Sequence, residues 1–315
     1  MKYVVIDLEW NQSADPEQVK ESLPFEIIEI GAVKLNENLE EESKFHQYIK
    51  PTCYKKLAPA IEKMLPYDEE TLNKGKSFVE VMEAFLTWCG EDYIFCTYGD
   101  TDLIQLQKNM DYYDMEKLKK PLAFYDVQRI YRFWKNDKKI VSLEHAVEHM
   151  GVKQSRPFHQ ALNDALYTAE VLKEIGQEKW IISIDVYNNP KNAKEEIFRK
   201  NKKGTLYITR EFEDKITAMQ QKRVRELRCA CCGKSLLEQI GWFASNLTIY
   251  YAVGYCKEHG YMRGKIKVKS TLEGKIFLIK TIKPIDESEA KSIELRQKEL
   301  REKRRERKKR IRIKE

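Results

Sequence analysis

Tyr3-Val4-Val5-Ile6-Asp7-Leu8-Glu9-Trp10 is the stretch that decides the fold. Its apolar, β-branched residues favour a strand that is buried on both faces. Side chains alternate along a strand, so Asp7 and Glu9 project from the same side, roughly 7 Å apart. Two acids at this distance repel each other and resist desolvation unless a cation lies between them, and their oxygens suit a divalent metal. The pair alone is also compatible with a solvated strand end, so the interpretation depends on the rest of the chain.

The composition indicates a soluble globular protein with room for two domains, because 42% of the 315 residues are hydrophobic and 34% are charged. No apolar run approaches the roughly 18 residues that span a bilayer. Since the first strand begins almost at the N-terminus, we expect no targeting peptide and a cytoplasmic location. The net charge of +7 is local: residues 291–315 hold 13 Lys or Arg and 5 Glu, an excess of +8, which leaves about −1 for the other 290 residues.

The segments after the first strand predict an α/β domain. Further strands are expected over residues 25–35 and 44–50, and the short connections predict an antiparallel meander. Apolar spacing predicts a helix over residues 78–88, and an apolar strand over residues 93–98 precedes a helix that extends through Met110. Pro157 places the start of another helix near His159. His159 and Asp164 are five residues apart, about 140° around a helix, so they can meet only if His159 folds back from the loop or first turn.

Three motifs follow one another along the chain: Ile6-Asp7-Leu8-Glu9, Tyr98-Gly99-Asp100-Thr101-Asp102 and His159-x4-Asp164. In this order and at these separations they resemble the DEDD exonuclease superfamily, histidine subclass, over about residues 1–176. The segment Ile27-Ile28-Glu29-Ile30-Gly31-Ala32 is similar to the second strand of that family. The sequence looks nearer to the RNA-trimming members of the KapD type than to polymerase proofreading subunits. In the second motif the resemblance favours Asp102 as the site residue, with Asp100 as a cap or a neighbouring group.

The resemblance implies a ribonuclease H-like fold with a mixed five-stranded sheet flanked by helices. It also implies that Asp7, Glu9, Asp102 and Asp164 hold two Mg²⁺ or Mn²⁺ ions and that His159 is the general base. Phosphodiester hydrolysis needs an activated water, charge relief and help for the leaving oxygen, which two divalent ions about 4 Å apart supply. Histidine, with an ordinary pKa near 6.5, suits the role of base near neutral pH. No Ser-His-Asp order, P-loop or Rossmann glycine pattern supports a competing chemistry.

Four of the seven cysteines lie close together in the second half of the chain. Cys229-x2-Cys232-Gly and Cys256-x2-His259-Gly predict two knuckle-like turns that hold one structural zinc ion in a zinc-ribbon-like domain. A reducing compartment favours metal over a disulfide for such a cluster, although an empty cysteine cluster is the alternative. Cys231 is left over and could substitute for one ligand. Cys53, Cys89 and Cys96 have apolar neighbours and are expected to be inert core thiols.

The expected organisation is an exonuclease domain over residues 1–180, a polar linker or helical spacer over 181–228, a zinc-ribbon-like domain over 229–284 and a basic helical or disordered tail over 285–315. The tail is either a solvated end or an arm that binds phosphates. The function implied is a metal-dependent 3′→5′ exonuclease acting on single-stranded nucleic acid with a free 3′ end, RNA being favoured over DNA. The alternative is a non-catalytic nucleic-acid-binding adaptor that retains an exonuclease-like fold, but the complete set of four acids and one histidine favours the enzyme.

Overall fold

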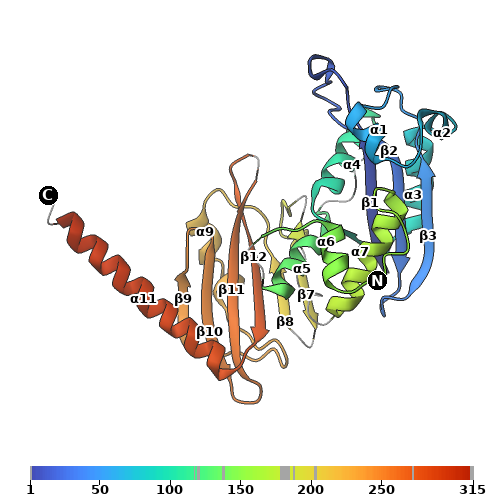
Figure 1. The fold of residues 1–315 in the computed structure, drawn as a ribbon. Coiled ribbons are helices and arrows are strands. Elements are labelled where there is room, and N and C mark those ends of the chain that lie inside the picture. Colours follow the sequence, from blue (N-terminus) through green and yellow to red (C-terminus); the bar gives the residue numbers. More distant parts are fainter. Residues whose placement is uncertain are drawn as a thin grey trace. The chain divides into compact units, whose positions relative to one another are not determined.

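A computed structural model describes residues 2–116, 118, 121–136, 139–177, 185–186, 189–201, 204–271 and 273–312. The chain forms two compact units, Met1–Asn188 and Asn189–Glu315, each built around its own sheet (Figure 1). Within the described residues, no helix is both long enough and apolar enough to cross a membrane.

The sheet of the first unit is mixed and has the strand order β3-β2-β1-β4-β5-β6. Strands β1 (Lys2–Asn11), β2 (Glu26–Leu35) and β3 (Glu41–Tyr48) form an antiparallel meander, as the short connections predict. Strands β4 (Tyr93–Thr97) and β5 (Ala123–Asp126) continue from β1 in parallel. The expected five strands are therefore present, and the two-residue β6 (Asp185–Val186) adds a short antiparallel edge.

The helices of the first unit are α1 (Pro59–Met64), α2 (Glu69–Asn73), α3 (Phe78–Cys89), α4 (Thr101–Tyr112), α5 (Val127–Lys135), α6 (Leu143–His149) and α7 (Ala161–Ile175), besides the short 3₁₀ helix Pro16–Gln18. Helix α3 starts with a capping box in which Ser77 and Glu80 bond reciprocally. One face of β1 packs against α3 and α4 through a cluster that includes Val4, Ile6 and Leu8. Because side chains alternate along a strand, Asp7 and Glu9 point to the opposite face.

Gly31 fixes how closely α7 approaches this opposite face. It lies on β2 directly across from Asp7. A Cβ atom at Gly31 would lie 2.0 Å from the backbone nitrogen of Leu162, in the first turn of α7. Only glycine therefore lets the start of α7 lie against the sheet at this point, and the start of α7 carries the third sequence motif.

The second unit contains a six-stranded sheet in the order β7-β8-β12-β11-β10-β9, with every neighbouring pair antiparallel. Its strands are β7 (Ile197–Asn201), β8 (Gly204–Ile208), β9 (Leu237–Ala244), β10 (Ile249–Cys256), β11 (Gly260–Ser270) and β12 (Ile276–Pro284). Helices α9 (Lys215–Gln220) and α10 (Lys222–Arg225) contribute Ala218 and Val224 to a core on one face. The long α11 (Glu287–Arg312) follows β12.

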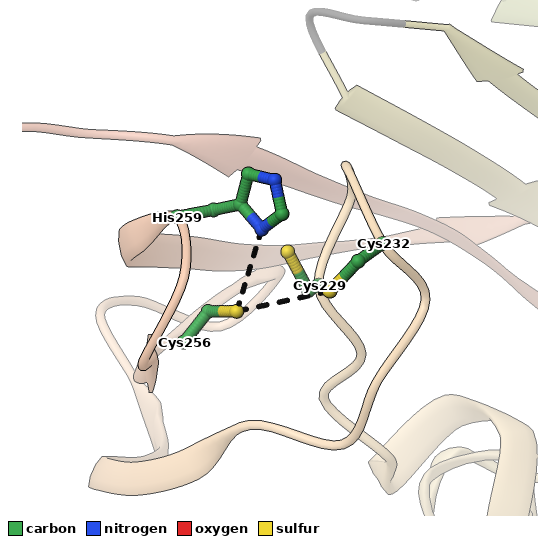
Figure 2. A group of neighbouring side chains, drawn as sticks. All are labelled: Cys229, Cys232, Cys256 and His259. Atoms are coloured by element: carbon green, nitrogen blue, oxygen red, sulfur yellow. Dashed lines mark hydrogen bonds between the residues drawn. The ribbon is translucent and has the colours of Figure 1, made fainter.

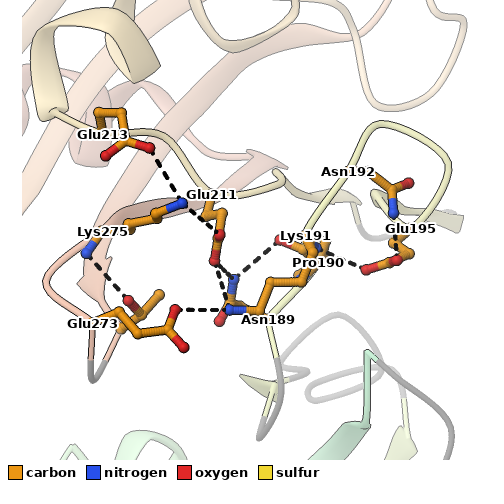
Figure 3. Close-up of polar contacts among 10 residues, drawn as sticks. Asn189, Pro190, Lys191, Asn192, Glu195, Glu211, Glu213, Glu273 and Lys275 are labelled. Carbon is orange, nitrogen blue, oxygen red and sulfur yellow. Dashed lines mark hydrogen bonds and ion pairs between the residues drawn. The ribbon is translucent and has the colours of Figure 1, made fainter.

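The structure differs from the linker or spacer that we expected over residues 181–228, because β7 and β8 in this stretch are strands of the second sheet. This stretch is polar because several of its charged side chains form ion pairs with one another and with charged residues before β12 (Figure 3). Lys191 Nζ lies 2.8 Å from Glu211 Oε2 and 3.2 Å from Glu273 Oε2. Lys275 Nζ lies 3.3 Å from Glu211 Oε1 and 3.2 Å from Glu213 Oε1. These contacts join the start of the unit to the segment after β8 and to the β11–β12 turn.

Candidate active site and metal centre

The acids of the first two motifs meet at the end of β1. Asp7 and Glu9 are partly buried on the face that α7 approaches. Asp102, in the first turn of α4, is buried, and the backbone N–H of Leu8 lies close enough to stabilise its carboxylate. This contact is available because the pairing of β1 with β4 extends only from Lys2 to Val5. Asp100 is exposed at the start of the helix and makes no capping bond with its side chain, so Asp102 is the acid of this motif that joins the cluster.

His159 and Asp164 meet because His159 lies outside α7 and the chain folds back, as the five-residue spacing requires. The His159 backbone has a φ of 61°, a left-handed conformation that is uncommon for a residue with a side chain and that concentrates at functional sites. In this conformation its N–H donates to Asp164 Oδ2 over 3.1 Å. One ligand atom from each of Glu9, His159 and Asp164 lies within 4.8 Å of the other two.

Burial, and after it the repulsion between neighbouring acids, raises the pKa values of the four carboxyl groups. Burial, followed by the neighbouring charges of Asp164, Glu29 and Asp102, raises the pKa of Glu9 to about 8. Burial is also the main reason why the pKa values of Asp102 and Asp164 rise to about 7. The pKa of Asp7 lies well above its usual range because of burial and then the charges of Asp102 and Asp164. Without a cation, the cluster resists full ionisation at neutral pH.

The donor set fits a divalent cation. Asp164 Oδ1 is buried and has no hydrogen-bond partner, although its other oxygen accepts from His159. A buried carboxylate oxygen without a partner is costly, and a cation would satisfy it. Carboxylate oxygens are the ligands that Mg²⁺ and Mn²⁺ prefer. Asp7, Glu9, Asp102 and Asp164 therefore form a suitable site, while His159 is exposed beside it.

One further acid next to this site was not singled out from the sequence. Glu29 is fully buried on β2, pairs in register with Glu9 and raises the pKa values of Asp7, Glu9 and Asp164. Its carboxylate contacts His46 Nε2 at 2.7 Å and accepts a hydrogen bond from the Tyr67 hydroxyl at 2.6 Å. A single acid inside the apolar run Ile27-Ile28-Glu29-Ile30 was the signal that could have identified it.

A second cluster lies in the second unit, where Cys229, Cys232, Cys256 and His259 converge (Figure 2). Cys256 and His259 flank the tight turn from β10 to β11, and Cys229 and Cys232 belong to the loop before β9. Gly233 and Gly260 end the two turns with φ values of 78° and 73°, which glycine adopts without steric cost. Cys231 is not part of the group of four.

The spacing within this second cluster matches a tetrahedral zinc site. Cys232 Sγ lies 3.8 Å from Cys256 Sγ, and Cys256 Sγ lies 3.6 Å from His259 Nδ1. Zinc bonds of about 2.3 Å to sulfur and about 2.0–2.1 Å to nitrogen place tetrahedral ligand pairs about 3.8 Å and about 3.5 Å apart. The hydrogen bond with His259 lowers the pKa of the Cys256 thiol to about 6, which favours the thiolate that binds metal. All four ligand positions are supplied by the protein, as in structural zinc sites.

Comparison with known proteins identifies relatives of the first unit. The exonuclease family model RNase T matches residues 4–172. The chain is 26% identical over 198 residues to ERI1 exoribonuclease 3 of Mus musculus. The aligned part covers 57% of this chain and 55% of that protein. It is 24% identical over 181 residues to "Probable 3'-5' exonuclease KapD" of Bacillus subtilis (strain 168), which covers 56% of this chain and 85% of that protein. The chain thus spans about half the length of the ERI1 exoribonuclease 3 that it matches.

Among solved structures, the chain is similar to the nuclease domain of 3'hExo, described as a DEDDh family member bound to rAMP. The TM-score is 0.50 at 18% sequence identity, over 59% of this chain and 96% of that domain. At this identity the similarity shows a shared fold, which is the ribonuclease H-like α/β fold that the motifs predict.

Proposed function

The chain belongs to the RNase T family of exonucleases, and from this membership we propose that it is a metal-dependent 3′→5′ exonuclease of single-stranded nucleic acid, with RNA favoured over DNA. The observation that carries the proposal is the close approach of Glu9, His159 and Asp164. Asp7 and Asp102 lie near enough to this group for their charges to act on one another and on Glu9 or Asp164. The name of ERI1 exoribonuclease 3 supports RNA as the substrate. The sequence holds all four acids and the histidine of the motifs. This favours the enzyme over a non-catalytic adaptor, because a site no longer under use would be expected to lose members.

Each residue of the site has a separate role in this proposal. The four acids hold Mg²⁺ or Mn²⁺, two ions in all, which when bound relieve the charge on the phosphate and ease ionisation of water. His159, exposed beside Glu9 and Asp164, accepts the proton of the attacking water at an imidazole nitrogen. The water oxygen forms a bond to phosphorus as the bond to the 3′-oxygen of the preceding nucleotide breaks, which releases a nucleoside 5′-monophosphate.

The test is incubation of the full chain with 5′-labelled single-stranded RNA and DNA in Mg²⁺, in Mn²⁺ or without divalent ions. We expect stepwise shortening from the 3′ end that requires a divalent ion and is faster on RNA. Asp102→Asn should abolish the shortening, while Asp100→Asn serves as the matched control because that acid is exposed. A chain that leaves both labelled strands intact under all conditions would point to the adaptor, and equal activity of the two variants would reject the assignment of Asp102.

We also propose that Cys229, Cys232, Cys256 and His259 hold one structural zinc ion. Zinc would join two turns on either side of the β9–β10 hairpin, so its loss should unfold part of the second unit. Cys229→Ser should remove about one zinc per chain by elemental analysis and increase proteolysis beyond residue 228. Cys231→Ser is the matched control, because Cys231 is not part of the cluster. Retention of zinc in Cys229→Ser, or its loss in Cys231→Ser, would contradict the assigned ligand set.

A further inference from the structure

The second unit contains a cavity of about 380 Å³ that is separate from the carboxylate site and borders the cysteine cluster. Its size falls within the range of roughly 300–1,000 Å³ that is typical of small-ligand sites. Phe198 of β7, Tyr207 of β8 and Lys280 of β12 line it as one cross-strand row, because Phe198 pairs with Tyr207 and Tyr207 pairs with Lys280. The segment that includes Arg223, Arg228 and Cys229 also lines the cavity, so the cysteine cluster borders it.

The cavity combines an exposed aromatic ring with a stacked guanidinium. Phe198 is 47% exposed, so its ring is accessible to a ligand. The Cζ atom of Arg223 lies 5.3 Å from the ring centroid of Phe198 and 4.7 Å from that of Tyr207. Stacking holds the guanidinium in place while its N–H edge remains able to bind a phosphate.

Lys280 supplies a buried cation whose ammonium donates two hydrogen bonds to the described part of the chain. Its side chain is 5% exposed, and its ammonium donates to the backbone carbonyl oxygens of Arg223 and Glu226. These two bonds explain why a lysine caps the end of α10, but an ammonium has three donors. Burial, together with the positive charges of Arg223 and Arg228, lowers the pKa of Lys280 to about 8. An anion in the cavity would both accept the third hydrogen bond and offset the neighbouring positive charges.

The balance of charge in the cavity also favours an anion. Glu226 is its acidic residue, and the Glu226 carboxylate already lies 3.1 Å from Arg228 Nε. Among the described residues, the lining cations Lys200 and Arg223 form no ion pair with an acid, and the ammonium of Lys280 donates to two backbone carbonyl oxygens. A flat ring stacking on Phe198 beside such cations is the way in which proteins hold the nucleotides of a single strand.

We propose that this cavity binds one nucleotide of a single-stranded nucleic acid, with the phosphate held by Arg223 and Lys280 and the base stacked on Phe198. The inference rests on the proposed class of substrate but not on the catalytic residues. A free mononucleotide offers the same chemistry, but we assign the cavity to a strand, because the first unit acts on strands in the proposed function.

The test measures binding of a fluorescein-labelled ten-nucleotide RNA to the full chain by anisotropy, in an Asp164→Asn background that prevents cleavage. Phe198→Ala should raise the Kd by roughly 5- to 150-fold, the measured range for loss of one stacked base. Arg223→Gln should raise the Kd about tenfold at low salt and flatten the slope of log Kd against log salt by about 0.7, the value for one phosphate contact. Phe198→Ala should leave that slope unchanged. Arg225→Gln is the matched control, because it removes the same charge from α10 at an exposed position that does not line the cavity.

Competition with AMP and with inorganic phosphate separates the sources of the ligand. We expect the RNA to bind at least tenfold more tightly than AMP, and AMP more tightly than phosphate. Equal weakening by Arg223→Gln and Arg225→Gln would overturn the inference, since binding would then depend on general charge. An unchanged Kd in Phe198→Ala, or AMP binding as tightly as the RNA, would also overturn it. If the wild-type chain cleaves RNA while these binding results fail, the exonuclease proposal stands alone, whereas a chain that neither cleaves nor binds RNA removes both.

Discussion

Asp7, Glu9, Asp102 and Asp164 make the stability of the first unit depend on pH when no divalent ion is bound. Their folded-state pKa values are raised, to about 8 for Glu9 and to about 7 for Asp102 and Asp164, from ordinary values of 4.5 and 3.8. At pH values between the ordinary and the raised pKa values, the folded state binds more protons than the unfolded state. The free energy of unfolding therefore falls as the pH rises. Their stabilising contribution is therefore complete below about pH 4 and is lost through pH 7 to 8.

The corresponding prediction concerns thermal unfolding. Without divalent ions, the Tm of the first unit should fall between pH 5 and pH 8.5, and Mn²⁺ should raise it more at pH 8.5 than at pH 5. Asp102→Asn should raise the metal-free Tm at pH 8.5 by several degrees, because about 1 kcal/mol corresponds to roughly 2–4 °C for a unit of this size. Asp100→Asn should behave like the wild type. A metal-free Tm that rises with pH over this range would show that the acids are not coupled as the structure places them.

The side chain and the backbone of His159 have different roles. The side chain is the proposed general base, whereas the backbone N–H holds Asp164. Its N–H donates to Asp164 whatever side chain the residue carries, so His159→Gln should keep the loop in place. We expect this change to lower kcat by about 10²–10⁴-fold, the usual contribution of a general base, while Mn²⁺ affinity measured by calorimetry changes little. His149→Gln removes an exposed histidine from α6 and serves as the control. Near-normal turnover in His159→Gln would exclude the imidazole as the base.

At the scale of the elements, the site depends on how closely β2 and α7 approach. In Gly31→Ala the new Cβ atom would meet the backbone of Ala161 and Leu162, and backbone atoms cannot move aside as a flexible side chain can. We expect a loss of more than about 1–3 kcal/mol of stability, the common cost of overpacking, together with loss of activity from displacement of Asp164. Chemical denaturation and the shortening assay provide the two measurements.

Gly151→Ala is the matched control for Gly31→Ala. Gly151 has a φ of 67° and open space around its Cβ position, so alanine there introduces backbone strain without a clash. Activity should persist in this variant while stability falls by about 1–2 kcal/mol. Were both variants equally active, the close approach of α7 would not be what positions the site.

The elements that carry the first site could be predicted because their signals are local. The apolar runs of β1 and β2 indicate buried strands, and Pro157 indicates where α7 can begin. Glu29 was not singled out, because its burial depends on His46 and Tyr67, which come from other segments. Residues 181–228 were interpreted as a linker or spacer because β8 completes its ladder with β12, and such a long-range pairing leaves no pattern within the stretch itself.

At the scale of the whole molecule, α11 combines a packed first part with a strongly basic end. Ala290 and Ile293 are buried against Ile240 and Val253 of the second sheet. Residues 301–315, by contrast, hold ten Lys or Arg against three Glu. The expected tail that begins at residue 285 is thus a helix over Glu287–Arg312 whose first part belongs to the core of the second unit.

Two truncations test this division. Removing residues 301–315 should weaken RNA binding and flatten its salt dependence, because fewer counterions are released, while the thermal unfolding of the second unit changes little. Removing residues 286–315 should also destabilise that unit by several kcal/mol, because two buried apolar side chains are lost. Turnover at saturating substrate should be similar for the shorter truncation and the full chain. An unchanged affinity and salt slope after removal of residues 301–315 would leave the basic segment as a solvated end.

The strand order of the second sheet also has a consequence for how the unit folds. Strands β9 to β12 pair with their neighbours along the chain, whereas β8 pairs Ile208 with Ile279 across most of the unit. Loop closure makes such distant pairings slower to form than local ones, so we expect the β9–β12 meander to form first and the β7–β8 hairpin to add to its β12 edge afterwards. Phe198 and Tyr207 both belong to this late hairpin, and a chain arrested before the hairpin adds would therefore lack the aromatic wall of the cavity.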